Sequence, residues 1–367
     1  MSRGPAPAVA AIRSAVRPVV AALRGDPPRP WPQRRPGMLL VACSGGADSV
    51  ALAAAVAFEA SRAGVAAGLV TIDHGLQDGS AERAAAVAAI GYELGLDPVE
   101  VVRVEVGRTG GPEAAARGAR YAALDATAEA LDAYVLLGHT LDDQAETVLL
   151  GLGRGSGPRS IAGMAAVDGR YLRPLLGIRR ATTLEACAVL ELPVWDDPHN
   201  HDPAFQRVRL RHEVLPLLED VLQGGVAEAL ARTGELLRDD LDALDAIAAA
   251  HLSRLVRAKP ADEPGKGGQL EQRPGVVRAK PADEPGKGGQ LGVGEVAALP
   301  RAVRTRVLRA WVRQLGGGPL TAERTAAIDA LITDWHGQGP IDLPGGVAVA
   351  RTSGTLVLYR EPPAPQE

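Results

Sequence analysis

Six consecutive residues, 44–49, have the composition of a loop that binds polyphosphate. They read Ser-Gly-Gly-Ala-Asp-Ser and directly follow the apolar run Met38–Cys43. Glycines let the backbone approach phosphate closely, and the unpaired N–H groups of the helix expected next would point at it. Asp48 would repel phosphate unless a cation lay between them, which predicts Mg²⁺ bound through Asp48. The predicted ATP-binding residues are Ser44, Gly45, Gly46, Ala47, Asp48 and Ser49.

The ending of this loop limits its chemistry. It lacks the Gly-Lys-Ser/Thr ending of the Walker loop, so it does not imply transfer of the γ-phosphate. It resembles instead the signature of the PP-loop ATP pyrophosphatases, a superfamily that splits ATP between its α and β phosphates. The alternative is an ordinary glycine-rich turn in which Ser44 caps the following helix.

A second group of polar residues begins at His139, where the sequence reads His-Thr-Leu-Asp-Asp-Gln-Ala-Glu. Thr140 is placed to cap a helix, so Asp142, Asp143 and Glu146 would lie within its first two turns. Acids in this position can simply complement the helix dipole. Three of them packed together repel one another, however, which favours a cationic partner such as an amine or Mg²⁺. We predict that Asp143 and Glu146 are catalytic, together with Asp48 of the loop.

Five further residues are candidates for contacts with the nucleotide. Asp73 and His74 end another apolar run, where they can contact nucleotide or metal or form a turn that caps the next helix. Arg117 and Arg120 lie one turn apart on a predicted helix and can bind phosphate or an adenylate, although surface arginines are common. We assign Arg120 to catalysis. We assign Asp73, His74, Arg117 and His139 to nucleotide binding.

These residues lie at equivalent points of a repeating pattern. Short apolar runs alternate with helix-like segments, which predicts an α/β fold with a parallel sheet and helices on both faces. In such sheets ligands bind where the carboxyl ends of the strands open into a crevice, and 44–49, 73–74 and 139–143 all follow predicted strands. The predicted strands are Met38–Cys43, Gly68–Asp73, Val99–Val106 and Ala133–Gly138, and the predicted helices cover about 8–23, 50–63, 81–94 and 113–130 and begin again at about 141.

The remainder of the chain predicts a second, smaller domain. Leucines at helical spacing predict a long helix over about 208–256, and the last part predicts an α+β unit with helices at about 299–315 and 321–335 and a hairpin around 352–354. The predicted domains are an N-terminal helix and Pro/Arg-rich loop (1–37), the PP-loop domain (38–215), a helical linker (216–255), a repeat insertion (256–294), a C-terminal domain (295–360) and a disordered tail (361–367).

The insertion is defined by an internal repeat. The segment Val256–Leu270 recurs identically at Val277–Leu291. Repeats that build solenoids have several copies and periodic apolar positions, and this one has neither. Its proline, glycine and charge content predicts a disordered surface segment.

Composition excludes several classes of protein. The formal charge is −4 and aromatic residues make up 3% of 367 residues, so any RNA contact would come from local clusters of arginine, at 207–211 and 301–313. Two separated cysteines, Cys43 and Cys187, exclude a disulfide framework and a Cys-x-x-Cys site. No uncharged apolar run approaches the roughly 18 residues of a membrane span and no signal peptide is evident, so we predict a cytoplasmic protein.

The chain contains several short motifs in a characteristic order. Beside the loop and the block His139–Leu150, they are His74-Gly-Leu with Ser80, Ala116-Arg117 with Arg120-Tyr121, Arg154-Gly-Ser-Gly157 with Gly163-Met164, Arg173-Pro-Leu-Leu176 and Asp197-Pro-His-Asn200. Together they resemble the tRNA(Ile)-lysidine synthetase family. The resemblance covers about 38–220 and continues more weakly through 299–359, whereas the repeat at 256–291 departs from the family pattern.

The resemblance implies an adenine nucleotide hydrolase-like (PP-loop) fold, ATP and Mg²⁺ as cofactors, and a defined reaction. ATP would adenylate the C2 oxygen of the wobble cytidine in an isoleucine tRNA with a CAU anticodon. The ε-amino group of L-lysine would then displace AMP and form lysidine. The C-terminal domain would contact the tRNA, and the protein would act as a monomer or homodimer without a membrane.

Three other functions remain open at this point. A tRNA thiolase would use the same kind of loop, but it would want paired cysteines to carry sulfur. A synthetase that uses ammonia to modify a small molecule would have no use for the arginine-rich C-terminal unit. A non-catalytic RNA-binding protein would not need Asp48, Asp143 and Glu146 intact.

Overall fold

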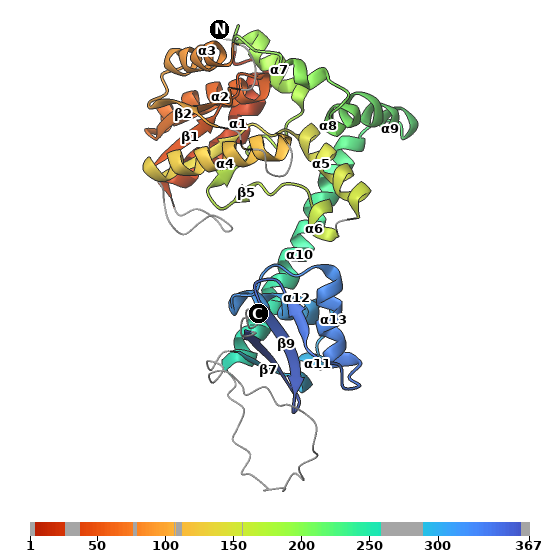
Figure 1. The fold of residues 1–367 in the computed structure, drawn as a ribbon. Coiled ribbons are helices and arrows are strands. Elements are labelled where there is room, and N and C mark those ends of the chain that lie inside the picture. The colour runs from red at the N-terminus through yellow and green to blue at the C-terminus, as the bar shows by residue number, and fades with distance from the viewer. Residues whose placement is uncertain are drawn as a thin grey trace, which may run out of the picture. The chain divides into compact units, whose positions relative to one another are not determined.

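The computed structural model contains two compact units, Met1–Leu237 and Arg238–Glu367 (Figure 1). The structure describes residues 4–25, 37–75, 79–105, 107, 112–155, 157–257 and 289–360. The predicted loop at 26–36 and the predicted disordered tail at 361–367 therefore lie outside the described residues. Within the described ranges, no helix is both long enough and apolar enough to cross a membrane.

A six-stranded sheet forms the centre of the N-terminal unit, in the order β3-β2-β1-β4-β6-β5. The neighbouring strands from β3 to β6 pair in parallel, and β5 pairs antiparallel with β6. Strand β1 lies in the middle, with Leu40 opposite Gly68 and Val135. The strands are β1 (Met38–Ala42), β2 (Ala66–Asp73), β3 (Val99–Arg103), β4 (Ala133–Leu137), β5 (Val167–Asp168) and β6 (Tyr171–Leu172).

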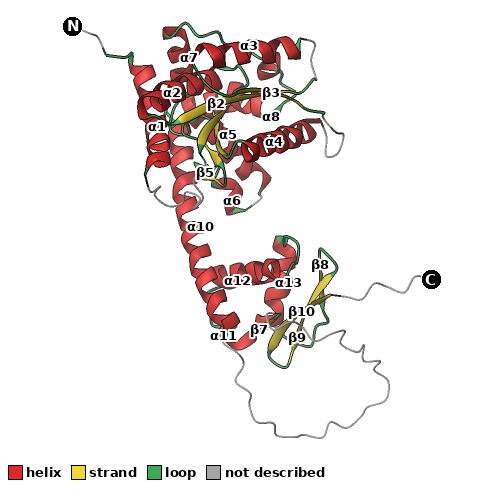
Figure 2. Ribbon diagram, turned by 90° about the vertical axis from the view of Figure 1, so that its left-hand side faces the viewer, coloured by secondary structure: helices red, strands yellow, loops and turns green. Residues whose placement is uncertain are grey.

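Helices cover both faces of this sheet (Figure 2), which confirms the predicted α/β fold. Leu39 and Val41 of β1 share a hydrophobic cluster with α1, α2, α3 and α7, whereas Leu40 shares another with Leu124 of α4. Successive side chains of a strand point to opposite faces, so β1 contributes to two cores. The helices are α1 (Pro7–Arg24), α2 (Ala47–Ala63), α3 (Ser80–Glu93), α4 (Pro112–Ala130), α5 (Leu141–Arg154), α6 (Pro158–Ile161) and α7 (Arg180–Val189).

The long helix predicted over 208–256 is broken in the structure. Gln223, Gly224 and Gly225 all have positive φ angles, which end one helix before the next begins. The carboxylate of Glu219 accepts hydrogen bonds from the N–H groups of Val226 and Ala227 and so caps the second helix. The segments in this region are η1 (Pro198–His201), α8 (Gln206–Arg209), the π-helical turn η2 (Leu210–Val214), α9 (Leu215–Val221) and α10 (Val226–Arg257).

The C-terminal unit is a small α+β fold, as predicted. Its four strands pair antiparallel in the order β7-β10-β9-β8, and the expected hairpin joins β9 to β10. The helices pack on this sheet around Trp311, whose side chain is fully buried. The elements are β7 (Gln290–Gly292), α11 (Val293–Ala297), α12 (Arg301–Gln314), α13 (Ala322–Thr333), β8 (Ile341–Leu343), β9 (Val347–Thr352) and β10 (Thr355–Arg360).

The second copy of the repeat does not end as the sequence pattern predicted. Its last residues, Gln290 and Leu291, belong to strand β7, and Leu291 pairs with Leu356 and is 1% exposed. The sheet of the C-terminal unit therefore begins inside the predicted insertion. An isolated leucine after a glycine-rich stretch carries no local strand signal, because the strand depends on its partner β10. Residues 258–288 lie outside the described residues.

Deleting 271–291 should preserve the C-terminal fold and nearly all activity. The two copies are identical, so the deletion joins Gln269-Leu270 to Gly292 and restores the sequence of β7. A shorter connection changes the closure free energy by only about 1 kcal/mol. Hydrogen exchange of β10 checks this expectation, with Leu291→Asp as the control that should lose protection there. Loss of β10 protection in the deletion variant would contradict it.

Candidate active site

The predicted phosphate loop connects β1 to α2 at the carboxyl end of the sheet. Gly46 occupies the N-cap of α2 without a side-chain cap, so the first-turn N–H groups are open to a ligand. Ser44 does not cap the helix, which removes the alternative of a simple capping turn. Gly45 has φ of +86°, and a Cβ there would lie 2.9 Å from Val87 Cγ2, so the close approach of loop and α3 needs glycine.

The hydroxyl of Ser49 has a structural task in this loop. It accepts a hydrogen bond from the N–H of Ser44 (3.1 Å) and donates one to the carbonyl of Gly46 (2.9 Å). Ser49 is also buried, whereas Ser44 is exposed. Of the two predicted hydroxyl donors, Ser44 is therefore the one open to a ligand, and Ser49 holds the loop in shape.

A cavity of about 380 Å³ lies beside the loop and contains several of the predicted residues. Ser44, Gly46, Asp73, His74 and Arg120 line it together with strand β2. The opposite wall comes from a segment that the sequence analysis did not assign to the site: Trp195, Asp197, His199 and Asn200. The N–H of Trp195 donates to the carbonyl of Gly45 (2.9 Å) and so fixes this segment on the loop.

Two cavity residues lack partners that a buried polar group normally has. Arg120 forms no ion pair within the described part of the chain, and burial lowers its pKa. The Nδ1 atom of His74 is buried without a hydrogen-bond partner among the same residues. The pKa of His74 is lowered, mainly by burial and to a smaller extent by the positive charge of Arg120. A partly buried arginine without a carboxylate partner fits an anionic ligand, such as a phosphate.

Asp73 contributes to this wall mainly through the turn that it forms. Its carboxylate accepts a hydrogen bond from the N–H of Gly75 (2.9 Å), and a hydrogen bond from the side chain of Ser80 is the main cause of its lowered pKa. Asp73 therefore forms the structural turn that was the alternative interpretation, and it also lines the cavity.

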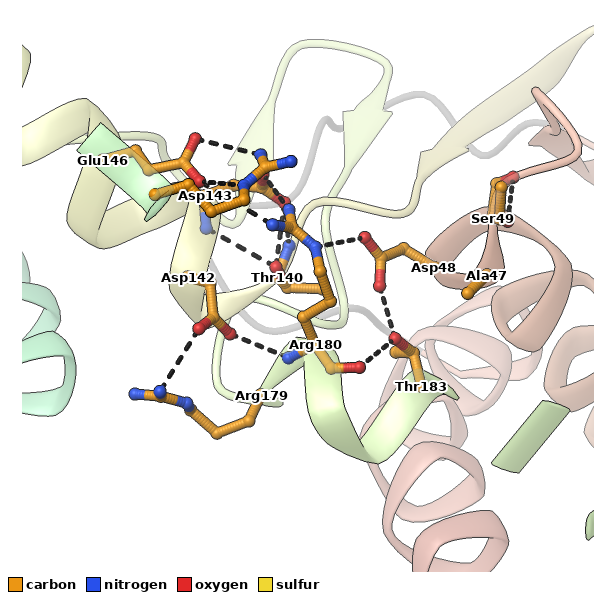
Figure 3. Close-up of polar contacts among 12 residues, drawn as sticks. Ala47, Asp48, Ser49, Thr140, Asp142, Asp143, Glu146, Arg179, Arg180 and Thr183 are labelled. Atoms are coloured by element: carbon orange, nitrogen blue, oxygen red, sulfur yellow. Dashed lines mark hydrogen bonds and ion pairs between the residues drawn. The ribbon is translucent and has the colours of Figure 1, made fainter. Parts of the chain in front are cut away.

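The acidic start of α5 forms as predicted. Thr140 caps the helix and Asp143 completes a capping box, with the N–H of Thr140 donating to Asp143 Oδ2 (2.8 Å). The acids do have cationic partners, but these are arginines of the same chain rather than open positions for an amine (Figure 3). Arg180 at the start of α7 lies 2.6 Å from Asp143 and 3.7 Å from Glu146.

Arg180 also joins this acidic helix to the phosphate loop. Its Nε lies 3.1 Å from Asp48 Oδ2, and Thr183 Oγ1 donates to the other oxygen of Asp48 (Figure 3). A second arginine, Arg211 of the π-helical turn, lies 2.8 Å from Glu146 and 3.6 Å from Asp143. Loop, acidic helix and two arginines therefore form one connected charged network.

Burial and ion pairing act against each other on the two aspartates. Burial raises the pKa of Asp48, although Arg180 and the hydrogen bond from Thr183 oppose this. Burial acts in the same direction on Asp143, but Arg180 and the hydrogen bonds at Thr140 outweigh it, so the pKa of Asp143 is lowered. Asp143 therefore stays ionised. Arg180 also stays charged, because Asp143 and Asp48 raise its pKa although burial acts to lower it.

Two predicted nucleotide contacts lie away from the first cavity. The Arg117 guanidinium lies over the ring of Tyr121, 4.9 Å from its centre, and lines a different cavity. His139 does not line the first cavity either. Burial lowers the pKa of His139 to about 4, so its ring is neutral at pH 7, and its Nδ1 lacks a partner among the described residues. The position of Arg117 does not support the prediction that it binds the nucleotide.

Several arginines that were predicted to contact RNA are paired within the chain. Arg304 forms a buried ion pair with Asp329 (2.6 Å), and Arg306 pairs with Asp245 (2.9 Å). Arg209 pairs with Glu213, and Arg211 belongs to the charged network described above. A run of arginines in sequence does not show which side chains have acidic partners in the fold. Arg304, being buried and paired, is therefore a poor candidate for an RNA contact, and which arginines of the clusters contact RNA stays a prediction.

Replacing Arg180 with methionine should destabilise the N-terminal unit in a pH-dependent way. Without the guanidinium, the pKa values of Asp48 and Asp143 rise, so keeping both ionised opposes folding at neutral pH. The expected loss is about 3 kcal/mol near pH 7, and it should shrink as the pH falls toward 4 and both carboxylates become protonated. Thermal unfolding at several pH values measures it.

The neighbouring Arg179 provides the control for this experiment. Its side chain is 39% exposed and pairs with Glu228 at 3.2 Å and with Asp142 at 3.3 Å. Because such half-exposed pairs contribute about 1 kcal/mol or less, Arg179→Met should cost little at any pH. An Arg180→Met loss that is the same at pH 4 and pH 7 would show that charge compensation is not the reason for it.

Two family models match the chain. A PP-loop domain matches residues 27–218, and the TilS substrate binding domain matches residues 291–357. The first match confirms the predicted PP-loop domain. The second corresponds to the C-terminal unit and begins at Leu291, in agreement with the position of β7.

A solved structure and two curated proteins are also similar to the chain. The U34-tRNA thiolase NcsA from Methanococcus maripaludis, with its [4Fe-4S] cluster, matches 63% of this chain and 80% of its own with a TM-score of 0.50; at 18% identity this likeness concerns the fold alone. The tRNA(Ile)-lysidine synthase of Streptomyces coelicolor is 52% identical over 97% of this chain and 99% of its own. That of Thermobifida fusca is 51% identical over 97% and 98%. With relatives this similar along nearly its whole length, the chain belongs to the tRNA(Ile)-lysidine synthase family.

Proposed function

We propose that this protein uses ATP to join L-lysine to C2 of the wobble cytidine in an isoleucine tRNA with a CAU anticodon. The observation that carries the proposal is the single guanidinium of Arg180, which contacts both Asp48 of the phosphate loop and Asp143 and Glu146 of α5. The ATP-binding loop and the acids suited to an amine are therefore neighbours. The family membership indicates a reaction that requires the ATP-binding loop and these acids to lie close together.

The first step is adenylation of the cytidine. The C2 oxygen of the base attacks the α-phosphorus of ATP, and pyrophosphate leaves. The open N–H groups at the start of α2 and the hydroxyl of Ser44 are placed to hold the phosphates. Arg120 in the cavity wall is the buried cation that can neutralise charge developing on the α-phosphate.

The residues present fit Mg²⁺ only in part. No group of three His, Cys, Asp or Glu side chains that could hold a metal occurs among the described residues. Asp48 offers one carboxylate, and that carboxylate already contacts Arg180 and Thr183. A single carboxylate suits an ion whose other ligands are phosphate oxygens and water. Mg²⁺ bound with ATP would neutralise the leaving pyrophosphate.

The second step is attack by lysine. Its ε-amino nitrogen bonds to C2, AMP leaves with its oxygen, and the nitrogen loses protons to a base. Free lysine also carries an α-ammonium and an α-carboxylate, so its site needs both signs of charge. Asp143 and Glu146 with Arg180 and Arg211 supply both signs within one network. We assign the amine contact to the two acids, which requires Arg180 or Arg211 to give up part of its contact with them, and one acid acts as the base.

The C-terminal unit corresponds to the matched substrate binding domain, and we assign it to tRNA contact.

A thiolase reaction is not favoured by this chain. It has two cysteines in all, and burial raises the pKa of both thiols, to about 11 for Cys187. Buried thiols with raised pKa values are poor sulfur carriers. The cytoplasmic location and the state as monomer or homodimer stay predictions.

One incubation tests the reaction as a whole. Protein, ATP, Mg²⁺ and labelled lysine are combined with the CAU-anticodon isoleucine tRNA, and label in RNA is measured together with AMP. In this assay Asp48→Asn should reduce AMP formation by about 100-fold or more, because the charge beside the phosphates is lost. Folding should not suffer, since burial already disfavours the ionised form of Asp48. AMP formation at the rate of the unmodified protein would refute this role.

A second variant separates lysine use from adenylation. Asp143→Asn keeps the shape that caps α5 but removes the charge, so it should raise the KM for lysine about tenfold or more while ATP-dependent adenylation persists. Asp142→Asn is the matched control, because Asp142 is on the same helix turn but pairs with Arg179. If both variants have the lysine KM of the unmodified protein, Asp143 does not bind the amine.

A further inference from the structure

A second cavity, of about 530 Å³, lies in the N-terminal unit and is not explained by the ATP site. Its walls come from α4, the second half of α5, α6 and α8. It is lined by Arg117, Thr147, Leu150, Gly151, Arg154, Arg159, Ser160, Gly163, Ala204, Phe205, Gln206 and Arg207. Four of these residues are arginines and none is acidic.

The walls of this cavity are held in place by close packing. A Cβ on Gly151 would collide with the carbonyl oxygen of Ser160, so only glycine lets α5 and α6 approach this closely. The amide of Gln144 donates to the carbonyl of Met164 (2.8 Å) and accepts from its N–H (2.7 Å). The turn after α6 is thereby fixed to α5, which keeps the arginines of both helices at one opening.

Two arginines at this cavity, Arg154 and Arg117, retain positive charge that no described carboxylate neutralises. Arg154 at the end of α5 is exposed and has no ion-pair partner within the part of the chain that the structure describes. Arg117 contacts only the ring and hydroxyl of Tyr121 there. Arg207 lies 3.6 Å from Glu146 but is also 43% exposed. A rigid, wide and basic opening with no acidic lining suits a polyanion.

This cavity borders both parts of the proposed active site. Arg207 contacts Thr147 Oγ1 (3.4 Å) and Glu146, so the acidic helix forms part of the boundary. Phe205 of the second cavity makes an edge-to-face contact with His199 of the first, with 5.7 Å between ring centres. A nucleotide chain at the second cavity would therefore lie next to the acids and across a thin wall from the ATP cavity.

We propose that this second cavity binds the phosphodiester backbone of the substrate RNA beside the nucleotide that is modified, with Arg154, Arg159 and Arg117 as phosphate contacts. RNA phosphates match the exposed guanidinium groups, and Phe205 offers an aromatic face to an unstacked base. The proposal rests on the proposed function and adds to it the place where the RNA enters the N-terminal unit. Phosphate contacts position RNA without reading its sequence.

The test compares Arg154→Gln with Arg232→Gln in the full-length protein. Arg232 is an exposed arginine of the same unit that does not line the cavity. Arg154→Gln should weaken binding of the CAU-anticodon tRNA about fivefold to tenfold and lower the slope of log Kd against log salt by about 0.7, as loss of one phosphate contact does. The KM for ATP and kcat at saturating tRNA should stay unchanged. Arg232→Gln should change none of these values.

The outcomes separate this inference from the proposed function. If the unmodified protein attaches no lysine to tRNA, the proposed function fails, while the salt slope still reports on RNA binding at the cavity. If it does attach lysine, but Arg154→Gln and Arg159→Gln both bind tRNA with unchanged Kd and slope, the cavity proposal is overturned. It is also overturned if Arg154→Gln abolishes inhibition by free pyrophosphate without affecting tRNA affinity, since the cavity would then serve a small anion.

Discussion

The structure of the candidate site depends on one charged contact, the guanidinium of Arg180 placed among the carboxylates of Asp48, Asp143 and Glu146. Three partly or fully buried carboxylates repel one another and could not share this space alone. Arg180 compensates them and ties α7 to the loop after β1 and to the start of α5. The contact lowers the pKa of both aspartates. Burial outweighs it at Asp48, whose pKa is raised, but not at Asp143, whose pKa is lowered with the help of the hydrogen bonds at Thr140.

The unpaired cation and the paired carboxylates occupy different parts of this site. Arg120 lines the cavity beside the loop, together with Asp73 and Asp197, and has no acidic partner in the described chain. Asp143 and Glu146 do not line that cavity and are held by arginines. In the proposed reaction, the phosphates of ATP would meet the cation of the first part, and the amine would meet the acids of the second.

Local pattern was sufficient for most of the fold but not for the charged network. Apolar runs followed by helix signals gave β1 to β4 and their helices within a few residues, and Thr140 marked the start of α5. Arg180 and Asp48 are 132 positions apart, and nothing in the sequence near Arg180 indicates this pairing. Leu291 shows the same limit, because its strand exists only through pairing with β10.

The wall between the two cavities constrains how the proposed reaction can proceed. In the proposed reaction the cytidine would reach the α-phosphate in the first cavity, while its backbone would be held at the second by the arginines. The wall is thin at His199 and Phe205, and Glu146 lies at its edge beside Arg207. A base that crosses at this point passes the acids that hold the amine, so the adenylated carbon is formed next to its nucleophile. In the proposed reaction this placement would favour attack by lysine over attack by water, because the nucleophile would already be held beside the adenylated carbon.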